Sequence, residues 1–534
     1  MNSLTGTGAL VRLALRRDRI MVPVWIAIFV STAAASASAT AGLYPTLTAR
    51  VAAAEAFNQT FALVAFYGRI YDPTSLGALA MLKAAGMGAF FVAVFTILIV
   101  VRHSRAEEET GRLELVGATV VGRVAPLTAA LLVAVGVNLI LALLTAGSLI
   151  SAGLPADGSL AFGFAWAGVG FAFAAIAGLT AQLTRSARTA TGSAVVILGV
   201  VYILRALGDT ADVGGPRWLT WLSPIGWSQQ LRPFAGNRWW ILLITLGFTL
   251  TVATFAYALV KRRDFGAGLL ADRPGPATAG AGLRSPLGLA WRLQRGSLLA
   301  WAGGFVLLGL VFGGIASNVA GFVDSPQARE MFAKLGGQKG LTDAFLATEL
   351  GFVGAFASAY GVQAAMRLHA EETGLRSESI LATATGRVGW AMSHIAIALS
   401  GTTALMVGVG LSAGIVHSAQ VGDMGRVAAV LVGALVYLPV AWILTAIVVA
   451  SFGVAPRLAA AGWVSLVVFL LLGEFGPLLE LPQWLMDLSP FTHVPKLPGA
   501  AFTWTPLLVL TAIAAGLTLW GLGRLRRRDI PATS

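Results

Sequence analysis

Two acidic stretches stand out because the rest of the chain carries so few charges. Residues 107–123 read EEETGRLELVGATVVGR, and residues 371–387 read EETGLRSESILATATGR. Only 11% of the 534 residues are charged, yet each stretch combines paired glutamates, a glycine, a further glutamate and a final Gly-Arg pair. A repeated acidic cluster of this kind suits a surface that docks a soluble partner. The alternative interpretation is a solvated loop with ordinary topogenic charge.

Other kinds of reactive site are excluded by what the sequence lacks. It contains no cysteine, which rules out disulfides, thiolate metal sites and cysteine nucleophiles. The five histidines are scattered, with no spacing that suits a metal ion. None of the lysines follows a glycine, so there is no Gly-Lys-Ser/Thr phosphate loop. We therefore expect no catalytic residue, no metal site and no cofactor bound by this chain.

The acidic stretches must be positioned by membrane-spanning helices. Hydrophobic residues make up 57% of the chain, and apolar runs of bilayer-crossing length recur throughout it. Glycines in the pattern Gly309-x-x-x-Gly313 and Gly410-x-x-x-Gly414 predict close helix packing in lipid. The sequence thus predicts an all-α polytopic membrane protein of about 12 transmembrane helices. We place them near residues 20–42, 79–101, 124–149, 160–183, 190–207, 240–260, 297–320, 345–367, 388–414, 426–451, 459–473 and 503–522.

The distribution of basic residues predicts the orientation of these spans. If the N-terminus is cytoplasmic, most of the 37 lysines and arginines fall in cytoplasmic segments, as the positive-inside bias requires. Both termini are then cytoplasmic, and the net charge of +13 reflects topology rather than a nucleic-acid partner. Acidic residues contribute little to topology, so the paired glutamates need another reason, which favours the docking surface.

An internal duplication divides the chain into two halves. Six spans per half is an even number, so the halves enter the membrane in the same direction, as parallel repeats. We expect a first half at 1–263, a cytoplasmic linker at 264–290 and a second half at 291–534. Four anchors recur in order, namely Arg16/Arg19/Trp25 with Arg292/Arg295/Trp301, EETG at 108–111 with 371–374, LSP at 222–224 with 488–490, and RRD at 262–264 with 527–529.

These features together resemble the membrane subunits of ABC-type exporters. Many members of that family carry a Glu-rich, Gly-containing Glu-x-Leu stretch after their second span, where a coupling helix meets the ATPase. The segment RRDFGAGLLADRPGPA followed by SPLGLAWRLQRGSLLAW, within 262–301, is similar to the fused twelve-span actinobacterial permeases labelled tetronasin or polyketide-antibiotic exporters. The resemblance implies export of hydrophobic or amphipathic compounds across the plasma membrane of a GC-rich bacterium.

The resemblance also implies partners and roles. ATP and Mg would be used by two copies of a separate ATP-binding cassette subunit, and this chain would not itself be an enzyme. After Gly111 and Gly374 the chain is expected to turn into an amphipathic surface helix, with Leu113, Val116 and Gly117 on one side. The second copy has one extra residue after its glycine, which leaves the equivalence of the docking surfaces open. The implied ATPase-coupling residues are Glu107, Glu108, Glu109, Gly111, Arg112, Glu114, Glu371, Glu372, Gly374, Arg376 and Glu378.

Aromatic stripes on the second span of each half are candidates for the substrate pathway, since that span lines the pathway in the resembled family. The alternative is ordinary helix packing. Lys83 and Glu349 could pair within the membrane, or each could simply extend to its interface. Trp218, Trp221, Trp227 and Trp484 are expected at the outer interface, where tryptophan is enriched. The candidate pathway residues are Met87, Phe90, Phe91, Phe95, Phe352, Phe356, Tyr360 and Gln363.

Two other classes of protein, secondary transporters and membrane enzymes, share some features with this sequence. GLLADRPG at 268–275 fits a loop of the major facilitator family, which would make this an ion-coupled secondary multidrug transporter. That loop belongs between spans 2 and 3, however, whereas here it follows span 6, and few ionisable groups lie within the spans. A membrane enzyme such as a lipid-linked glycosyltransferase needs clustered acidic residues in an outer loop. The first outer loop offers only Glu55 and Asp72, far apart in sequence.

Overall fold

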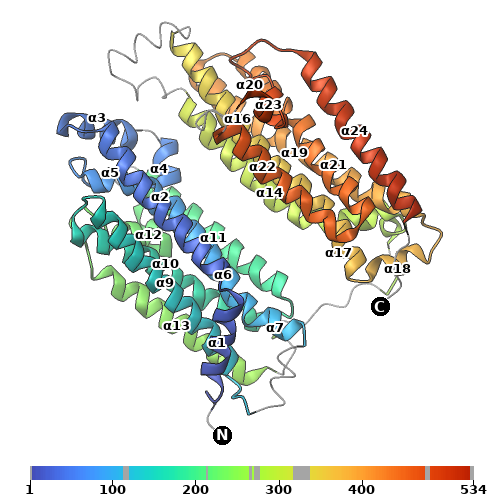
Figure 1. The fold of residues 1–534 in the computed structure, drawn as a ribbon. Helices are drawn as coiled ribbons and strands as arrows, with labels where there is room; N and C mark the ends of the chain where they lie inside the picture. The colour runs from blue at the N-terminus through green and yellow to red at the C-terminus, as the bar shows by residue number, and fades with distance from the viewer. Residues whose placement is uncertain are drawn as a thin grey trace. The chain divides into compact units, whose positions relative to one another are not determined.

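The computed structural model describes residues 3–59, 61–111, 120–211, 215–263, 268–269, 277–278, 280–316, 337–475 and 482–528. These residues form helices and connecting turns, with no strand among them. Twelve helices in this described part are long and apolar enough to cross a membrane, which confirms the predicted fold class. The chain divides into two compact units, Met1–Pro274 and Gly275–Ser534 (Figure 1).

Unit 1 begins with a short helix that leads into its first span. The second span contains a wider turn at Ala84–Gly88, and it ends in the small helix α7. The helices of unit 1 are α1 (Thr7–Arg17), α2 (Met21–Leu43), α3 (Leu47–Gln59), α4 (Phe61–Tyr67), α5 (Leu76–Lys83), α6 (Ala89–Arg102), α7 (Arg105–Glu109), α9 (Ala125–Ser151), α10 (Ala156–Leu183), α11 (Ala187–Thr210), α12 (Pro224–Gln230) and α13 (Ile241–Arg262).

Unit 2 follows the same order of long helices. We call basal the end of each unit where its first span begins and its sixth span ends, and distal the opposite end. The helices of unit 2 are α14 (Pro286–Ala316), α16 (Gly337–Ala365), α17 (Arg367–Thr373), α18 (Arg376–Leu381), α19 (Arg387–Val421), α20 (Gly425–Leu435), α21 (Leu438–Val454), α22 (Ala461–Leu470), α23 (Gln483–Met486) and α24 (Trp504–Arg527).

Small residues bring the helices of each unit into close contact. A Cβ added to Gly313 of α14 would lie 2.4 Å from the backbone oxygen of Ala413 in α19, and one on Gly309 would lie 2.0 Å from Ser412 Oγ. In unit 1, a Cβ on Gly163 of α10 would meet a backbone oxygen of α9 at 2.3 Å. Added Cβ atoms on Gly410 and Gly414 of α19 would each lie 3.0 Å from a backbone Cα of α20, that of Leu431 or Val427. Both Gly-x-x-x-Gly patterns therefore lie at helix contacts, as close packing in lipid predicts.

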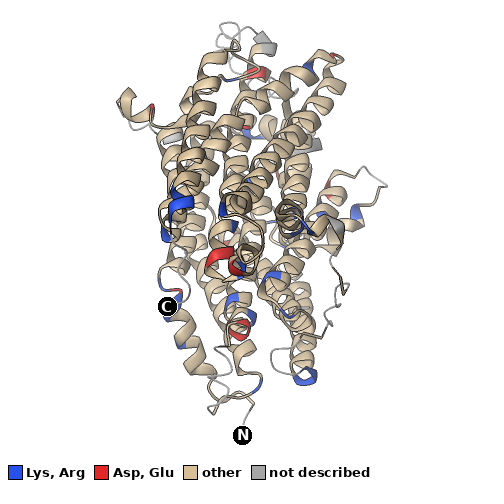
Figure 2. Cartoon of the chain, turned by 90° about the vertical axis from the view of Figure 1, so that its right-hand side faces the viewer, with Lys and Arg blue, Asp and Glu red and all other residues tan. Residues whose placement is uncertain are grey.

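An aromatic contact joins the first and second spans in each unit. Trp25 of α2 stacks on Phe95 of α6 with ring centroids 5.1 Å apart, and Trp301 of α14 meets Tyr360 of α16 at 6.1 Å. Both tryptophans belong to the first anchor of the sequence duplication. Charged residues are sparse along the long helices in Figure 2, so apolar packing of this kind dominates the interior of each unit.

Candidate functional site

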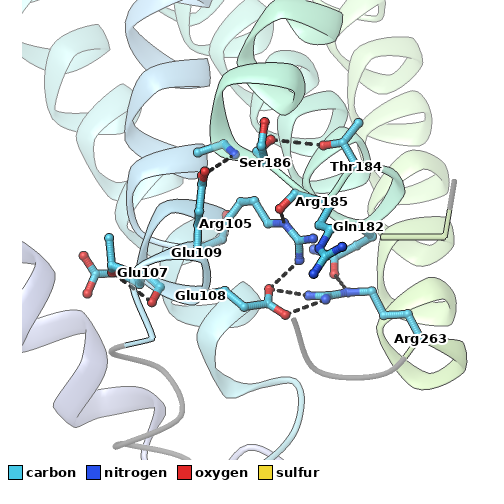
Figure 3. A network of polar contacts seen from close by, with 12 residues as sticks. Arg105, Glu107, Glu108, Glu109, Gln182, Thr184, Arg185, Ser186 and Arg263 are labelled. Carbon is cyan, nitrogen blue, oxygen red and sulfur yellow. Dashed lines mark hydrogen bonds and ion pairs between the residues drawn. The ribbon is translucent and has the colours of Figure 1, made fainter. Parts of the chain in front are cut away.

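Glu108 lies in α7 at the basal end of unit 1, with its carboxylate turned toward two arginines (Figure 3). Arg263 donates to it twice, from Nη1 to Oε1 at 2.6 Å and from Nη2 to Oε2 at 2.7 Å. Arg105 donates from Nη1 to Oε2 at 2.8 Å. Glu108 is only 7% exposed. A buried, two-pronged arginine–carboxylate pair fixes geometry as well as adding energy.

The same arginines tie several spans together. Arg263 follows the sixth span and donates from Nε to Gln182 Oε1 at the end of α10, at 2.8 Å. Arg105 donates from Nε to the backbone oxygen of Arg185, between α10 and α11, at 3.0 Å. Arg123, before α9, donates to the backbone oxygen of Arg263 at 2.6 Å. We call Arg105, Glu108, Arg123, Gln182 and Arg263 the first clamp.

The first clamp is a closed structural joint rather than a ligand pocket. The space beside it is about 40 Å³, against roughly 300 Å³ or more for a typical small-molecule site. The clamp lies where the second span ends, since Glu108 belongs to α7. The clamp thus ties α7 to the basal ends of the fourth and sixth spans.

The two glutamates beside Glu108 make different contacts. Glu107 pairs with Arg17 at the end of α1. Glu109 is exposed and accepts a hydrogen bond from the backbone nitrogen of Ala187 at 2.8 Å. Near them, Asp18 is buried and lies 2.5 Å from Nε2 of His103. The contacts of Arg17 and Asp18 attach the end of α1 to the end of the second span, whereas that of Glu109 joins α7 to α11.

Unit 2 contains a corresponding set of contacts, here called the second clamp (Arg367, Glu371, Glu372, Arg387 and Arg528). Arg528 follows α24 and donates from Nη2 to Glu372 Oε2 at 2.5 Å. Arg387 donates to the backbone oxygen of Arg528 at 2.6 Å, as Arg123 does to Arg263 in unit 1. In each clamp the arginine after the sixth span is the second arginine of the repeated RRD motif, which is Arg263 in unit 1 and Arg528 in unit 2.

The two clamps differ in how the carboxylates share their partners. Glu108 binds both the arginine of its own helix and the arginine after the sixth span. In unit 2 these roles are divided: Glu371 pairs with Arg367 at 2.7 Å, and Glu372 pairs with Arg528. α17 begins four residues before Glu371, whereas α7 begins three before Glu108. The units therefore present similar but unequal basal surfaces.

The turns after these helices also differ. Gly111 has φ +71°, the left-handed conformation that a glycine turn predicts. Gly374 has φ −86°, and the left-handed residue is its neighbour Leu375, with φ +57°. Glycine fits at 374 because an added Cβ would lie 2.9 Å from the backbone oxygen of Ala370. Arg376 folds back there to bind Glu371 at 3.0 Å.

The burial of the glutamates differs from the open acidic surface expected from sequence. Glu108, Glu371 and Glu372 are buried inside their own units. Arginines distant in sequence pair with Glu108 and Glu372, whereas the nearby Arg367 and Arg376 pair with Glu371. Glu109 and Glu378 are exposed. Arg112, Glu114, Leu113, Val116 and Gly117 lie outside the described residues. The assignment of both acidic stretches to ATPase coupling stays a prediction.

The candidate pathway residues of unit 1 do not share one environment. Phe95 is 2% exposed and packs on Trp25. Met87 and Phe90 are half-buried, and the Phe90 ring meets Tyr202 edge-on at 5.5 Å. Phe91 is 46% exposed. Phe95 is thus a packing residue, while Phe91 lies on the surface of the unit.

The second stripe divides in the same way. Tyr360 is 1% exposed and packs beside Trp301, whereas Phe352 and Phe356 are 42% and 49% exposed. Gln363 accepts from Trp301 Nε1 at 3.3 Å and donates to Ser297 Oγ at 2.9 Å, so it bridges to the first span of unit 2. A lining role for the exposed members stays a prediction.

The remaining expectations concern single positions. Lys83 is exposed at the end of α5, and Glu349 is half-buried in α16 of the other unit, so their pairing stays a prediction. Trp218 and Trp484 are 62% and 67% exposed. Trp227 is instead buried, because it packs on Phe248 and donates from Nε1 to a neighbouring backbone oxygen.

Sequence reasoning missed the basic half of each clamp. Arg263 and Arg528 were noted only as members of a repeated motif, although that repetition was the available signal. An arginine is repeated at the end of the sixth span, and a glutamate is repeated after the second span. A contact between these two residues in both halves would explain the parallel repetition. Nothing in the sequence indicates the Asp18–His103 contact.

The chain is similar in sequence to known proteins along nearly its whole length. The chain matches the family described as multidrug efflux system permease Rv1217c, C-terminal domain, over residues 9–261 and 283–526. It is also 44% identical, over 532 residues, to the multidrug efflux system permease protein Rv1217c of Mycobacterium tuberculosis. That match covers 99% of this chain and 96% of the relative.

Proposed function

This chain belongs to the multidrug efflux system permease family, and on that premise we propose that it is the membrane subunit of an ATP-driven exporter. Two copies of a separate ATP-binding cassette subunit hydrolyse ATP with Mg, one beneath each unit. The chain lies in the plasma membrane of a bacterium with both termini in the cytoplasm. Its cargo is a hydrophobic or amphipathic compound of the antibiotic or drug-like class.

The observation that supports this proposal best is the pair of clamps. Each clamp joins the helix after the second span to the end of the sixth span, through Glu108 and Arg263 in unit 1 and Glu372 and Arg528 in unit 2. The clamp glutamates also belong to the two acidic stretches that the family resemblance assigns to ATPase coupling. A partner pressing on that segment would therefore move the spans together rather than bend one loop.

The physical basis of this coupling is the stiffness of a buried charged joint. Arg263 holds both oxygens of Glu108 and, through Nε, the end of α10. A two-pronged pair has little freedom to slide, and separating buried charges is costly. A push on α7 thus reaches the basal ends of the second, fourth and sixth spans. In the proposed cycle, closure of the ATPase subunits supplies that push and the units rock to release cargo outward.

The exposed acidic residues are the proposed contacts with the ATPase. Glu109 is exposed at the end of α7, and Glu378 is exposed in α18. The Glu378 carboxylate makes no hydrogen bond or ion pair with another described residue. A rim charge of this kind sets the orientation and rate of docking more than its final strength. The buried carboxylates serve instead to transmit the motion.

Single-cysteine crosslinking tests this assignment without labelling at other positions of the chain, because the chain contains no cysteine. Glu109→Cys and Glu378→Cys would each be labelled with a photoactivatable maleimide in the tagged, full-length chain in native membranes. Ser151→Cys, exposed at the distal end of α9, is the matched control. We expect an ATP-binding cassette subunit to crosslink at the two basal positions and not at Ser151. Purified chain that carries no such subunit, or adducts only at Ser151, would contradict the proposal.

A further inference from the structure

A polar cavity lies at the distal end of unit 1, beside the end of α11 that is remote from the first clamp. Its volume is about 520 Å³. Asp209 is the acidic residue of its lining, and the basic ones are Arg69, Arg217, Arg232 and Arg238. Guanidinium groups stay charged at any physiological pH, so the lining carries three more positive charges than negative ones.

Asp209 is already occupied by other contacts. Its Oδ1 accepts from Thr220 Oγ1 at 2.8 Å, and its Oδ2 lies 3.4 Å from Nη1 of buried Arg205. Two of the lining arginines brace the backbone: Arg69 donates to the backbone oxygen of Asp209 at 2.5 Å, and Arg217 donates to that of Ala211 at 3.1 Å. These contacts explain why Arg69 and Arg217 are present, but they leave the other two arginines unexplained.

Arg232 and Arg238 lack an anionic partner among the residues that the structure describes. The Arg232 guanidinium lies over the Tyr71 ring at 4.2 Å, and its buried Nε makes no hydrogen bond within the described part of the chain. Burial and then the charge of Arg238 lower the pKa of Arg232. Arg232 and Arg238 are both half-buried, and two neighbouring cations repel each other unless an anion lies between them.

The backbone that carries these two arginines is strained. Arg232, Phe234 and Asn237 all have left-handed conformations, with φ of 53°, 62° and 33°, which non-glycine residues rarely adopt and which cluster at functional sites. The Phe234 ring anchors this turn, since a Cβ added to Gly77 or Gly158 would lie 2.5 or 2.1 Å from it. The turn thus holds both arginines at the cavity at a conformational cost.

Further groups around the cavity suit an anion with an apolar body. Burial and then the charge of Asp209 raise the pKa of Tyr71 to about 12, so its hydroxyl keeps its proton. That hydroxyl accepts from Gln230 at 2.7 Å, which leaves its proton available to a ligand. Trp221 lines the cavity and stacks on Trp240 at 6.0 Å, and both rings are partly exposed.

We propose that this cavity binds the phosphate or carboxylate head group of an amphiphile, held between Arg232 and Arg238 with its apolar part against Trp221 and Trp240. Arginine favours such oxyanions because its planar donors match two oxygens at once. The amphiphile is either an anionic lipid of the surrounding bilayer or an anionic compound in transit. Both share the head-group chemistry that the arginines recognise.

Binding to the purified, delipidated full-length chain tests the proposal by native mass spectrometry. The probes are phosphatidylglycerol, phosphatidylcholine, dodecyl phosphate and inorganic phosphate as competitor. We expect the Arg232→Gln/Arg238→Gln variant to lose affinity for the anionic probes by about tenfold or more per guanidinium, while the control Arg50→Gln is unchanged. Preference for phosphatidylglycerol assigns the site to a bilayer lipid, and preference for dodecyl phosphate assigns it to a mobile amphiphile.

A stability measurement separates ligand binding from a merely structural role. Removing one of two repelling cations should leave the ligand-free thermal midpoint of Arg238→Gln unchanged or higher, and should reduce the rise that dodecyl phosphate gives the wild type. Arg238→Lys keeps the charge but not the paired donors, and it should bind with intermediate affinity. Equal binding of zwitterionic and anionic probes, or wild-type affinity in the double variant, would overturn the proposal.

Discussion

Replacing Glu108 by glutamine removes the charge at the centre of the first clamp. The Arg105 and Arg263 side chains are then left with 1% and 11% exposure and no anion between them. Breaking a buried pair by removing one partner costs about 3–5 kcal/mol, because it leaves buried charge uncompensated. Glu109→Gln is the matched control: the side chain is exposed and accepts one backbone hydrogen bond, so we expect a cost below about 1 kcal/mol.

The measurement is equilibrium unfolding of the purified chain in mixed micelles, with a double-mutant cycle through Arg263. Glu108→Gln/Arg263→Gln should be less destabilised than the sum of the single variants, since each single change leaves the other partner unpaired. The difference should reach about 1–3 kcal/mol. A Glu108→Gln variant within about 0.5 kcal/mol of wild type, or additive effects in the cycle, would show that the clamp is not a stiff joint.

Further changes test the packing, the turns and the coupling surface. Glu109→Lys and Glu378→Lys should each lower substrate-stimulated ATPase activity of the complex several-fold with unchanged thermal midpoints, and unchanged activity would exclude a docking role. Gly313→Leu should lower stability by about 1–3 kcal/mol or more, because its Cβ meets a backbone oxygen at 2.4 Å. Gly111→Ala should cost about 1 kcal/mol from φ +71° alone, since an added Cβ would meet no non-neighbouring atom of the described residues within 4 Å. Leu375→Gly should instead raise stability by up to about 1 kcal/mol by relieving its left-handed backbone, which chemical unfolding would detect.

The spans could be predicted from sequence because length and hydropathy together determine which segments can cross a bilayer. Their limits could not. The third span of unit 2 was expected at 388–414, but α19 continues to Val421, because buried His417 and Ser418 extend the helix with polar side chains. The second span of unit 1 was expected to end at 101, and α6 ends at Arg102, but a turn at 103–104 leads directly into α7, which continues the segment to Glu109. Hydropathy falls at the polar end of α19 although that helix does not stop there.

The basal site was predicted only in its acidic half. The repeated glutamates were visible, yet their burial depends on arginines that lie more than 150 residues away, as in Glu108 and Arg263. A composition-based interpretation assigns carboxylates in a cytoplasmic loop to the solvent, because it has no information on tertiary partners. The distal cavity escaped detection for the same reason, since Arg232 and Arg238 are unremarkable in sequence and gain meaning only beside Tyr71.

ATP dependence is the property on which the proposed function rests. Inside-out vesicles containing the chain together with its ATP-binding cassette partner should accumulate a hydrophobic fluorescent compound when ATP and Mg are supplied. Vesicles containing the chain alone should accumulate none, with or without a pH gradient. Uphill accumulation by the chain alone, driven by a pH gradient without nucleotide, would contradict the proposed function and identify an ion-coupled transporter instead.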